Sequence, residues 1–257
     1  MKVWPIFKKE IRLYFASPIG YAILFFFTVA MGFFFWVYFS QYTRMSMQAM
    51  MNPMAARDVN VIEWVLRPLF SGFLSIVLLL SLVPAISMRL IAEERKSQTL
   101  ELLMTYPVSD TAILLGKFFA GLALYGCMLA TSMVYLAILL YFTPLEWAAV
   151  GAMYGGLLLM GAAFLAIGLF VSSLTENQII AALGTFALLL ILWAIGWGAD
   201  ATAGSISDIL RHVSASDHID GFTKGVIETR DVIYFVDVTI VFLVFGLLSL
   251  QTRRWKG

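Results

Sequence analysis

One segment of the sequence concentrates the charged side chains that could bind another protein. The chain has 17 basic and 16 acidic residues, and eight of these charged residues lie in residues 89–117. The eight are Arg89, Glu93, Glu94, Arg95, Lys96, Glu101, Asp110 and Lys117. Residues 90–105 contain neither Gly nor Pro, and Leu100, Leu103 and Met104 keep the i, i+3, i+4 spacing of one helix face. This pattern predicts a helix with a charged start. The helix is either a solvated helical loop, in which Glu and Lys side chains pair with each other, or a docking helix for a cytoplasmic protein.

The residues needed for hydrolytic chemistry are missing from the sequence. A phosphate-binding loop requires Gly-x-x-x-x-Gly-Lys followed by Ser or Thr, whereas Gly116-Lys117 is followed by Phe118. Neither His212 nor His218 belongs to a His-Glu-x-x-His pair, which leaves a membrane-embedded hydrolase as a weak alternative. We therefore expect no catalytic residue, no metal site and no cofactor bound by this chain.

A methionine cluster is the one group of soft ligands. It consists of Met45, Met47, Met50, Met51 and Met54. Thioethers bind copper(I), but flexible methionine more often fills irregular apolar contacts, and we favour this second interpretation.

Two further features lie in apolar surroundings. Asp237 is the one acid inside a long apolar run, about five residues or ~8 Å from its start. A proton relay is possible there, but we favour a carboxylate that water or a hydrogen bond reaches at the outer end, because shallow charges cost less. Gly151 and Gly155 form a Gly-x-x-x-Gly motif, which favours close helix packing, within the subunit rather than between subunits.

Capping residues are predicted at two helix starts. Pro107 ends the charged helix, and Asp110 is placed to cap the next one. The spacing of Thr175 and Gln178 is typical of a capping box, with Thr175 as the N-cap.

The composition places these residues in a membrane. Hydrophobic residues make up 61% of the 257 residues and charged residues 13%, against about 25% charged in soluble domains. This excludes an ordinary soluble enzyme, and a net charge of +1 argues against nucleic-acid binding. With one cysteine, Cys127, the chain has neither a disulfide framework nor a thiolate metal site.

Long runs without charge predict six spanning helices in one all-α transmembrane domain of residues 1–257. A helix needs about 20 apolar residues to cross the hydrocarbon layer. The apolar cores of the six spans are residues 19–39, 69–88, 118–141, 149–171, 179–197 and 232–250. A barrel is excluded because these runs do not alternate apolar and polar residues. Residues 199–231 form a long outer loop with short helices.

An amphipathic helix precedes the first span. Residues 1–17 carry apolar side chains on one helix side and Lys8, Lys9 and Arg12 on the other, which predicts a helix lying along the headgroups. Pro18 and Gly20 then allow the chain to turn into the membrane. Eleven of the 17 basic residues fall on the side of both termini and residues 89–117. Both termini are therefore predicted to be cytoplasmic.

Three stretches resemble ABC-2-type transporter permeases, specifically their gliding-motility-like branch. They are residues 89–110 with Leu115-Gly116-Lys117, residues 172–178 and residues 218–234. The resemblance covers essentially the whole chain. It implies a bacterial inner-membrane exporter subunit whose cytoplasmic coupling helix, between spans two and three, contacts a separate ATPase.

The resemblance also assigns partners and site residues. ATP and Mg would be bound by the partner ATPase, expected in two copies, and a second permease, identical or a paralogue, would complete the translocation path. The residues implied to contact the ATPase are Glu93, Glu94, Arg95, Lys96 and Glu101. A secondary ATPase contact by Glu176 is the less favoured alternative to helix capping by residues 175–178. Short re-entrant helices in residues 199–231 would close the path from outside. An ion-coupled secondary transporter or channel that uses Asp237 without an ATPase is the alternative.

Overall fold

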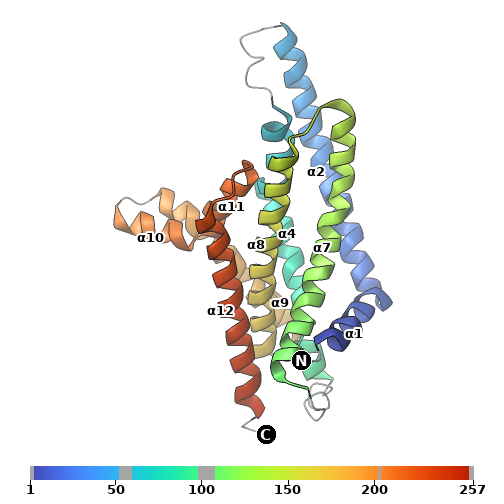
Figure 1. Cartoon of the computed structure of the whole chain (residues 1–257), viewed down its shortest axis with the longest axis vertical. Helices are drawn as coiled ribbons and strands as arrows, with labels where there is room; N and C mark the ends of the chain where they lie inside the picture. Colours follow the sequence, from blue (N-terminus) through green and yellow to red (C-terminus); the bar gives the residue numbers. More distant parts are fainter. Residues whose placement is uncertain (1–2, 52–59, 98–107, 202–203, 255–257) are drawn as a thin grey trace.

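The computed structural model describes residues 3–51, 60–97, 108–201 and 204–254, which are almost entirely helical (Figure 1). The elements are α1 (Val3–Ala16), α2 (Pro18–Met51), a π-helical turn η2 (Ile62–Leu66), α3 (Arg67–Ser71), α4 (Phe73–Ser87), α5 (Ala92–Lys96), α7 (Asp110–Phe142), α8 (Trp147–Leu174), α9 (Gln178–Asp200), α10 (Ser205–Val213), α11 (Ala215–Thr223) and α12 (Thr229–Arg254). No strand occurs in these ranges. The predicted all-α fold is confirmed.

The six predicted spans are also confirmed. Six helical segments are long and apolar enough to cross a membrane, and each contains one of the predicted apolar cores. Helix α1 and the end of α12 lie at the same end of the bundle (Figure 1). We call this end the basal end and the opposite one the distal end. The assignment of the basal end to the cytoplasm stays a prediction.

The first span extends well beyond its predicted apolar core. Helix α2 has 34 residues, which corresponds to about 51 Å, against the ~30 Å of a hydrocarbon layer. Part of the methionine cluster therefore lies on a helix instead of a loop, with Met47 64% and Met50 85% exposed. Met54 lies outside the described residues.

The second span is interrupted near its distal end, which its uninterrupted apolar run does not reveal. Gly72 has an extended backbone (ψ 145°) and separates α3 from α4. A side chain at this position would meet the carbonyl of Pro68 and, at 2.8 Å, the hydroxyl of Tyr38. The break thus depends on the missing side chain of glycine.

Helix α8 is the centre of the bundle and contacts α4, α7, α9, α11 and α12. Its close approaches occur at Gly156 against the ring of Phe222 and at Gly161 against the ring of Tyr125. A methyl group added at either of the predicted packing residues Gly151 and Gly155, by contrast, would have no atom of the described residues within 4 Å. The structure thus has no close approach at these two glycines among the described residues, and helix packing at Gly151 and Gly155 stays a prediction.

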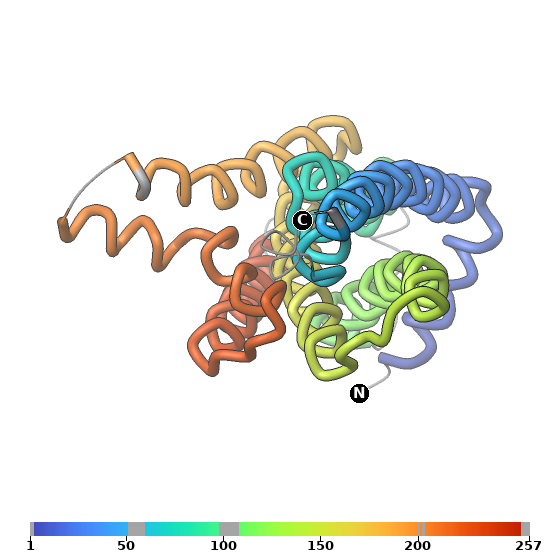
Figure 2. The backbone as a smooth tube through the Cα atoms, turned by 90° about the horizontal axis from the view of Figure 1, so that it is seen from above, coloured from blue at the N-terminus to red at the C-terminus, as the bar shows by residue number. Residues whose placement is uncertain are grey.

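Two short helices form the distal segment expected for residues 199–231. Helix α11 is anchored in the bundle by buried Ile219 and Phe222, whereas α10 has no buried residue. Figure 2 shows α10 and the end of α9 extending to one side of the bundle. On α11, burial would raise the pKa of the Asp220 carboxyl, but hydrogen bonds from Lys224 and Arg67 outweigh burial and lower the pKa below its ordinary value.

Candidate functional site

The N-terminal helix lies against the basal end of α7. The predicted helix in residues 1–17 is confirmed as α1, and Pro18 begins α2 after a bend at Ser17. Its placement among lipid headgroups stays a prediction. Gly116 of α7 permits the contact, because a side chain there would lie 2.7 Å from Ile6.

The buried face of α1 includes an acid. Ile6, Glu10 and Tyr14 recur every fourth residue and are buried, whereas Trp4 is 69% exposed. The hydroxyl of Tyr14 donates a hydrogen bond to the carbonyl oxygen of Ile86 at 2.9 Å. The burial of Glu10 is compensated by a cation on α7.

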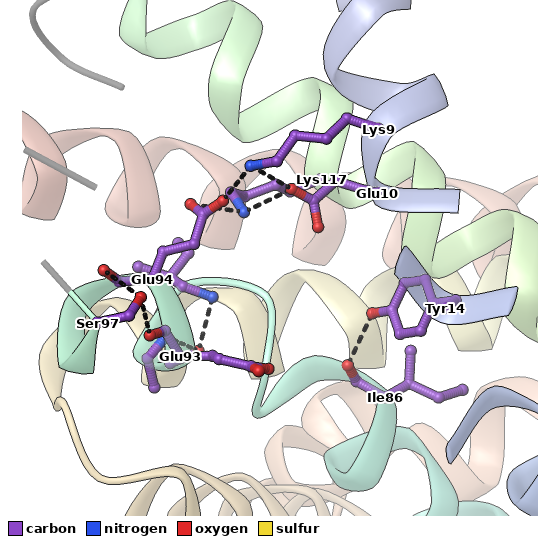
Figure 3. A network of polar contacts seen from close by, with 11 residues as sticks. Lys9, Glu10, Tyr14, Ile86, Glu93, Glu94, Ser97 and Lys117 are labelled. Carbon is purple, nitrogen blue, oxygen red and sulfur yellow. Dashed lines mark hydrogen bonds and ion pairs between the residues drawn. The ribbon is translucent and has the colours of Figure 1, made fainter. Parts of the chain in front are cut away.

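That cation is Lys117, which is the centre of a four-charge network (Figure 3). Its ammonium group, 1% exposed, lies 2.9 Å from Glu10 Oε1 and 2.8 Å from Glu94 Oε2. Lys9 Nζ lies 2.6 Å from Glu94 Oε1. Two cations and two anions balance, as buried charges require. The network joins α1, α5 and α7, three elements far apart in the sequence.

The pKa of Lys9 reports the same balance. Burial would lower the pKa of its ammonium group, but the hydrogen bond to Glu94 and the negative charges of Glu94 and Glu10 outweigh burial and raise the pKa above its ordinary value. Lys9 is therefore charged at neutral pH. The same hydrogen bond holds α1 to α5.

Helix α5 is bound on its other side to the turn between α8 and α9. The hydroxyl oxygen of Ser172 accepts hydrogen bonds from the backbone N–H groups of Ile91 (3.3 Å) and Ala92 (3.0 Å), two donors at the start of α5. Arg95 donates to the carbonyl oxygen of Ser173 at 2.9 Å and to Glu176 Oε1 at 2.8 Å. A displacement of α5 would therefore pull directly on the ends of α8 and α9.

The residues implied to contact an ATPase have different environments. Glu94 is buried in the network, and Arg95 and Glu176, far apart in the sequence, bind each other. Glu93 accepts two hydrogen bonds from Arg89, at 2.6 and 2.9 Å, and its side chain is 44% exposed. Lys96 is exposed. Glu101 lies outside the described residues, so α5 shows only the first part of the helix predicted for residues 90–105.

The two predicted helix caps are each displaced by one or two residues. Ser109, not Asp110, caps α7, and its hydroxyl accepts from the N–H of Ala112. Asn177, not Thr175, caps α9, and its Oδ1 accepts from the N–H of Ile179 at 2.9 Å. Ser and Asn are among the strongest N-caps, so the error lies in the boundary and not in the type of residue.

A cleft lies between α1 and α5. Its volume is about 340 Å³. The cleft is lined by Lys9, Glu10, Leu13, Tyr14, Ser17, Arg89, Leu90, Glu93, Glu94 and Ser97.

Sequence reasoning assigned no role to Glu10, Lys117 or Ser172. One feature of the sequence indicated that Glu10 is buried: it lies four residues from both Ile6 and Tyr14, on an otherwise apolar helix face.

Asp237 belongs neither to the four-charge network nor to the cleft. It lies on the exposed side of α12, and no hydrogen bond or ion pair joins it to another of the described residues. The carboxylate therefore does not line a path through the interior of this chain.

One comparison with known proteins identifies a match. The family model of the ABC-2 family transporter protein matches residues 4–255, nearly the whole chain. No curated protein matches the sequence.

Proposed function

Since this chain belongs to the ABC-2 family of transporter proteins, and is thus a permease of an ABC transporter, we propose that it forms the translocation path of an ATP-driven exporter whose ATPase is a separate subunit. The observation that carries this proposal is the fastening of α5 to α1, α7 and the α8–α9 turn through Glu94, Lys9, Lys117 and Arg95. A force applied to α5 reaches several spanning helices at once.

The motor must lie on a partner, because the sequence contains no phosphate-binding loop. We propose that ATP and Mg are bound by two copies of an ATPase and that this chain contributes no catalytic residue. A second permease, identical or a paralogue, completes the path. Both termini and α5 face the cytoplasm of a bacterial cell, in accord with the excess of basic residues at the basal end.

In this mechanism the closure of the ATPase subunits pushes α5. The displacement tilts α2, α4 and α9 and opens an outward path for an amphipathic or lipid-linked cargo. The alternative of an ion-coupled transporter that uses Asp237 is not favoured, because this carboxylate lies on the outside of the bundle.

The exposed charges of α5 provide the test. Glu94 is unsuitable because its reversal would disrupt the buried network, whereas Glu93 and Lys96 reach the surface. We expect the double reversal E93K/K96E to reduce the amount of ATPase that purifies with the tagged chain by about tenfold or more, since like charges placed at an interface are repelled.

The matched control is D208K/R211E, which exchanges an acid and a base on exposed α10, away from the basal end (Figure 1). It should purify with as much ATPase as the wild type. Undiminished ATPase in the E93K/K96E preparation would reject docking at α5.

A further inference from the structure

One side of α12 is not covered by the other described helices. The helix packs mainly on α8, and the side chains of the opposite side are exposed. This stripe consists of Ile233, Val236, Asp237, Ile240, Val241, Val244 and Leu248. At 100° per residue these positions cover an arc of roughly 140°, with Asp237 well inside it. The stripe is apolar except for this one carboxylate.

The depth of Asp237 makes lipid a poor neighbour. It follows Arg230 by seven residues, or about 10 Å of helix, and apolar residues continue from there to Leu250. The short side chain of aspartate does not extend back over such a distance to the headgroups. An acid that faces hydrocarbon costs on the order of 3 kcal/mol at the helix centre and less toward the ends, and such residues are normally paired.

We propose that in the assembled transporter this stripe is covered by a membrane-spanning helix of a different chain, which places a Lys or Arg side chain against Asp237. A cation at this depth would itself be costly without an acid, so the two residues would select each other. The β-branched residues of the stripe favour the same conclusion, because their single preferred rotamer in a helix leaves little side-chain entropy to lose on packing.

A second copy of this chain does not supply the cation. None of the six apolar cores contains Lys or Arg. Lys117, which lies next to the core of α7, is 1% exposed and already bound to Glu10 and Glu94. A two-fold contact through this stripe would moreover set the acids of the two copies against each other. The proposal requires only that α12 spans the membrane, so it does not depend on docking at α5.

Cys127 allows a depth-matched test. It is exposed on α7, about 14 Å from Phe118, and Ile240 lies about 15 Å from Arg230, so both positions are near the middle of the membrane. A spin label would be attached either to Cys127 of the natural chain or to residue 240 of C127S/I240C. The transporter would be purified with all its native subunits into lipid nanodiscs, and the collision rate of each label with dissolved oxygen measured.

We expect a several-fold lower collision rate at residue 240 than at Cys127, and a rise to the Cys127 value when D237L is added. The isolated chain carrying D237L should melt no lower than the wild type, since Asp237 is exposed and has no hydrogen bond or ion pair with another of the described residues. D237N, which keeps the size of the side chain, should raise the collision rate partially.

Three results would overturn the proposal. Equal collision rates at the two positions would show that lipid covers the stripe. A low rate at residue 240 that D237L leaves unchanged would show a partner indifferent to the acid. Two labels at residue 240 found close together in one complex, by dipolar coupling, would identify a second copy as the occupant.

Discussion

Lys117→Met should lower the free energy of unfolding by about 3–5 kcal/mol, the loss expected when one partner of a buried ion pair is removed. The substitution keeps the aliphatic length of the side chain but leaves Glu10 and Glu94 without the cation that lies within 2.9 Å of both. The measurement is the thermal denaturation of the detergent-purified chain, followed by size-exclusion chromatography.

Two controls separate charge balance from lost packing. Lys8→Met removes an exposed cation of α1 and should change stability by less than about 0.5 kcal/mol. The triple variant E10Q/E94Q/K117M removes the buried charges together and should recover much of the loss, since neutral replacement of a whole buried network is often tolerated. If K117M and K8M denature alike, the network does not hold α1, α5 and α7 together.

Gly161→Ala should destabilise the chain by about 1–3 kcal/mol, because the new methyl group would enter the ring of Tyr125. Tyr125 is fully buried, and its hydroxyl donates to the carbonyl oxygen of Leu157 at 3.1 Å, so the ring has no space to move into. The denaturation temperature of the purified chain measures the effect.

Gly155→Ala is the matched control on the same helix. No atom of the described residues lies within 4 Å of the added methyl position, and alanine favours helix formation by up to ~1 kcal/mol over glycine. Its stability should equal or exceed that of the wild type. Equal losses in the two variants would mean that α8 and α7 do not approach as closely as the structure has them. A loss of permease pairing alone in G155A would locate Gly155 at a contact between subunits.

The membrane architecture was predictable because the length of a charge-free apolar run determines it. A charge-free run long enough to cross hydrocarbon is visible in the sequence, and all six predicted cores lie within spanning helices. Interruptions were less visible. At Gly72 a side chain would meet the hydroxyl of Tyr38, which comes from another span, and no local pattern of residues reveals such a close approach.

The contacts of α5 with α1 and α7 were only partly predictable, for a similar reason. The charge density of residues 89–117 marked α5, but the sequence does not reveal that Glu94 faces inward while Glu93 and Lys96 face outward. That distinction depends on Lys117 and Lys9, which approach from α7 and α1. Long-range pairing of this kind is a property of the folded chain and not of any one segment.

The central claim is that a separate ATPase moves this permease through α5. It is tested most directly by the distance between spin labels at Tyr141 and Ile209 in the C127S background, two exposed positions on α7 and α10. In the purified complex, Mg, ATP and vanadate should shift this distance by several ångströms. The shift should be absent from the E93K/K96E variant and from the chain purified alone. A nucleotide-dependent shift in the chain alone, or an unchanged distance in the ATP-hydrolysing complex, would contradict the account.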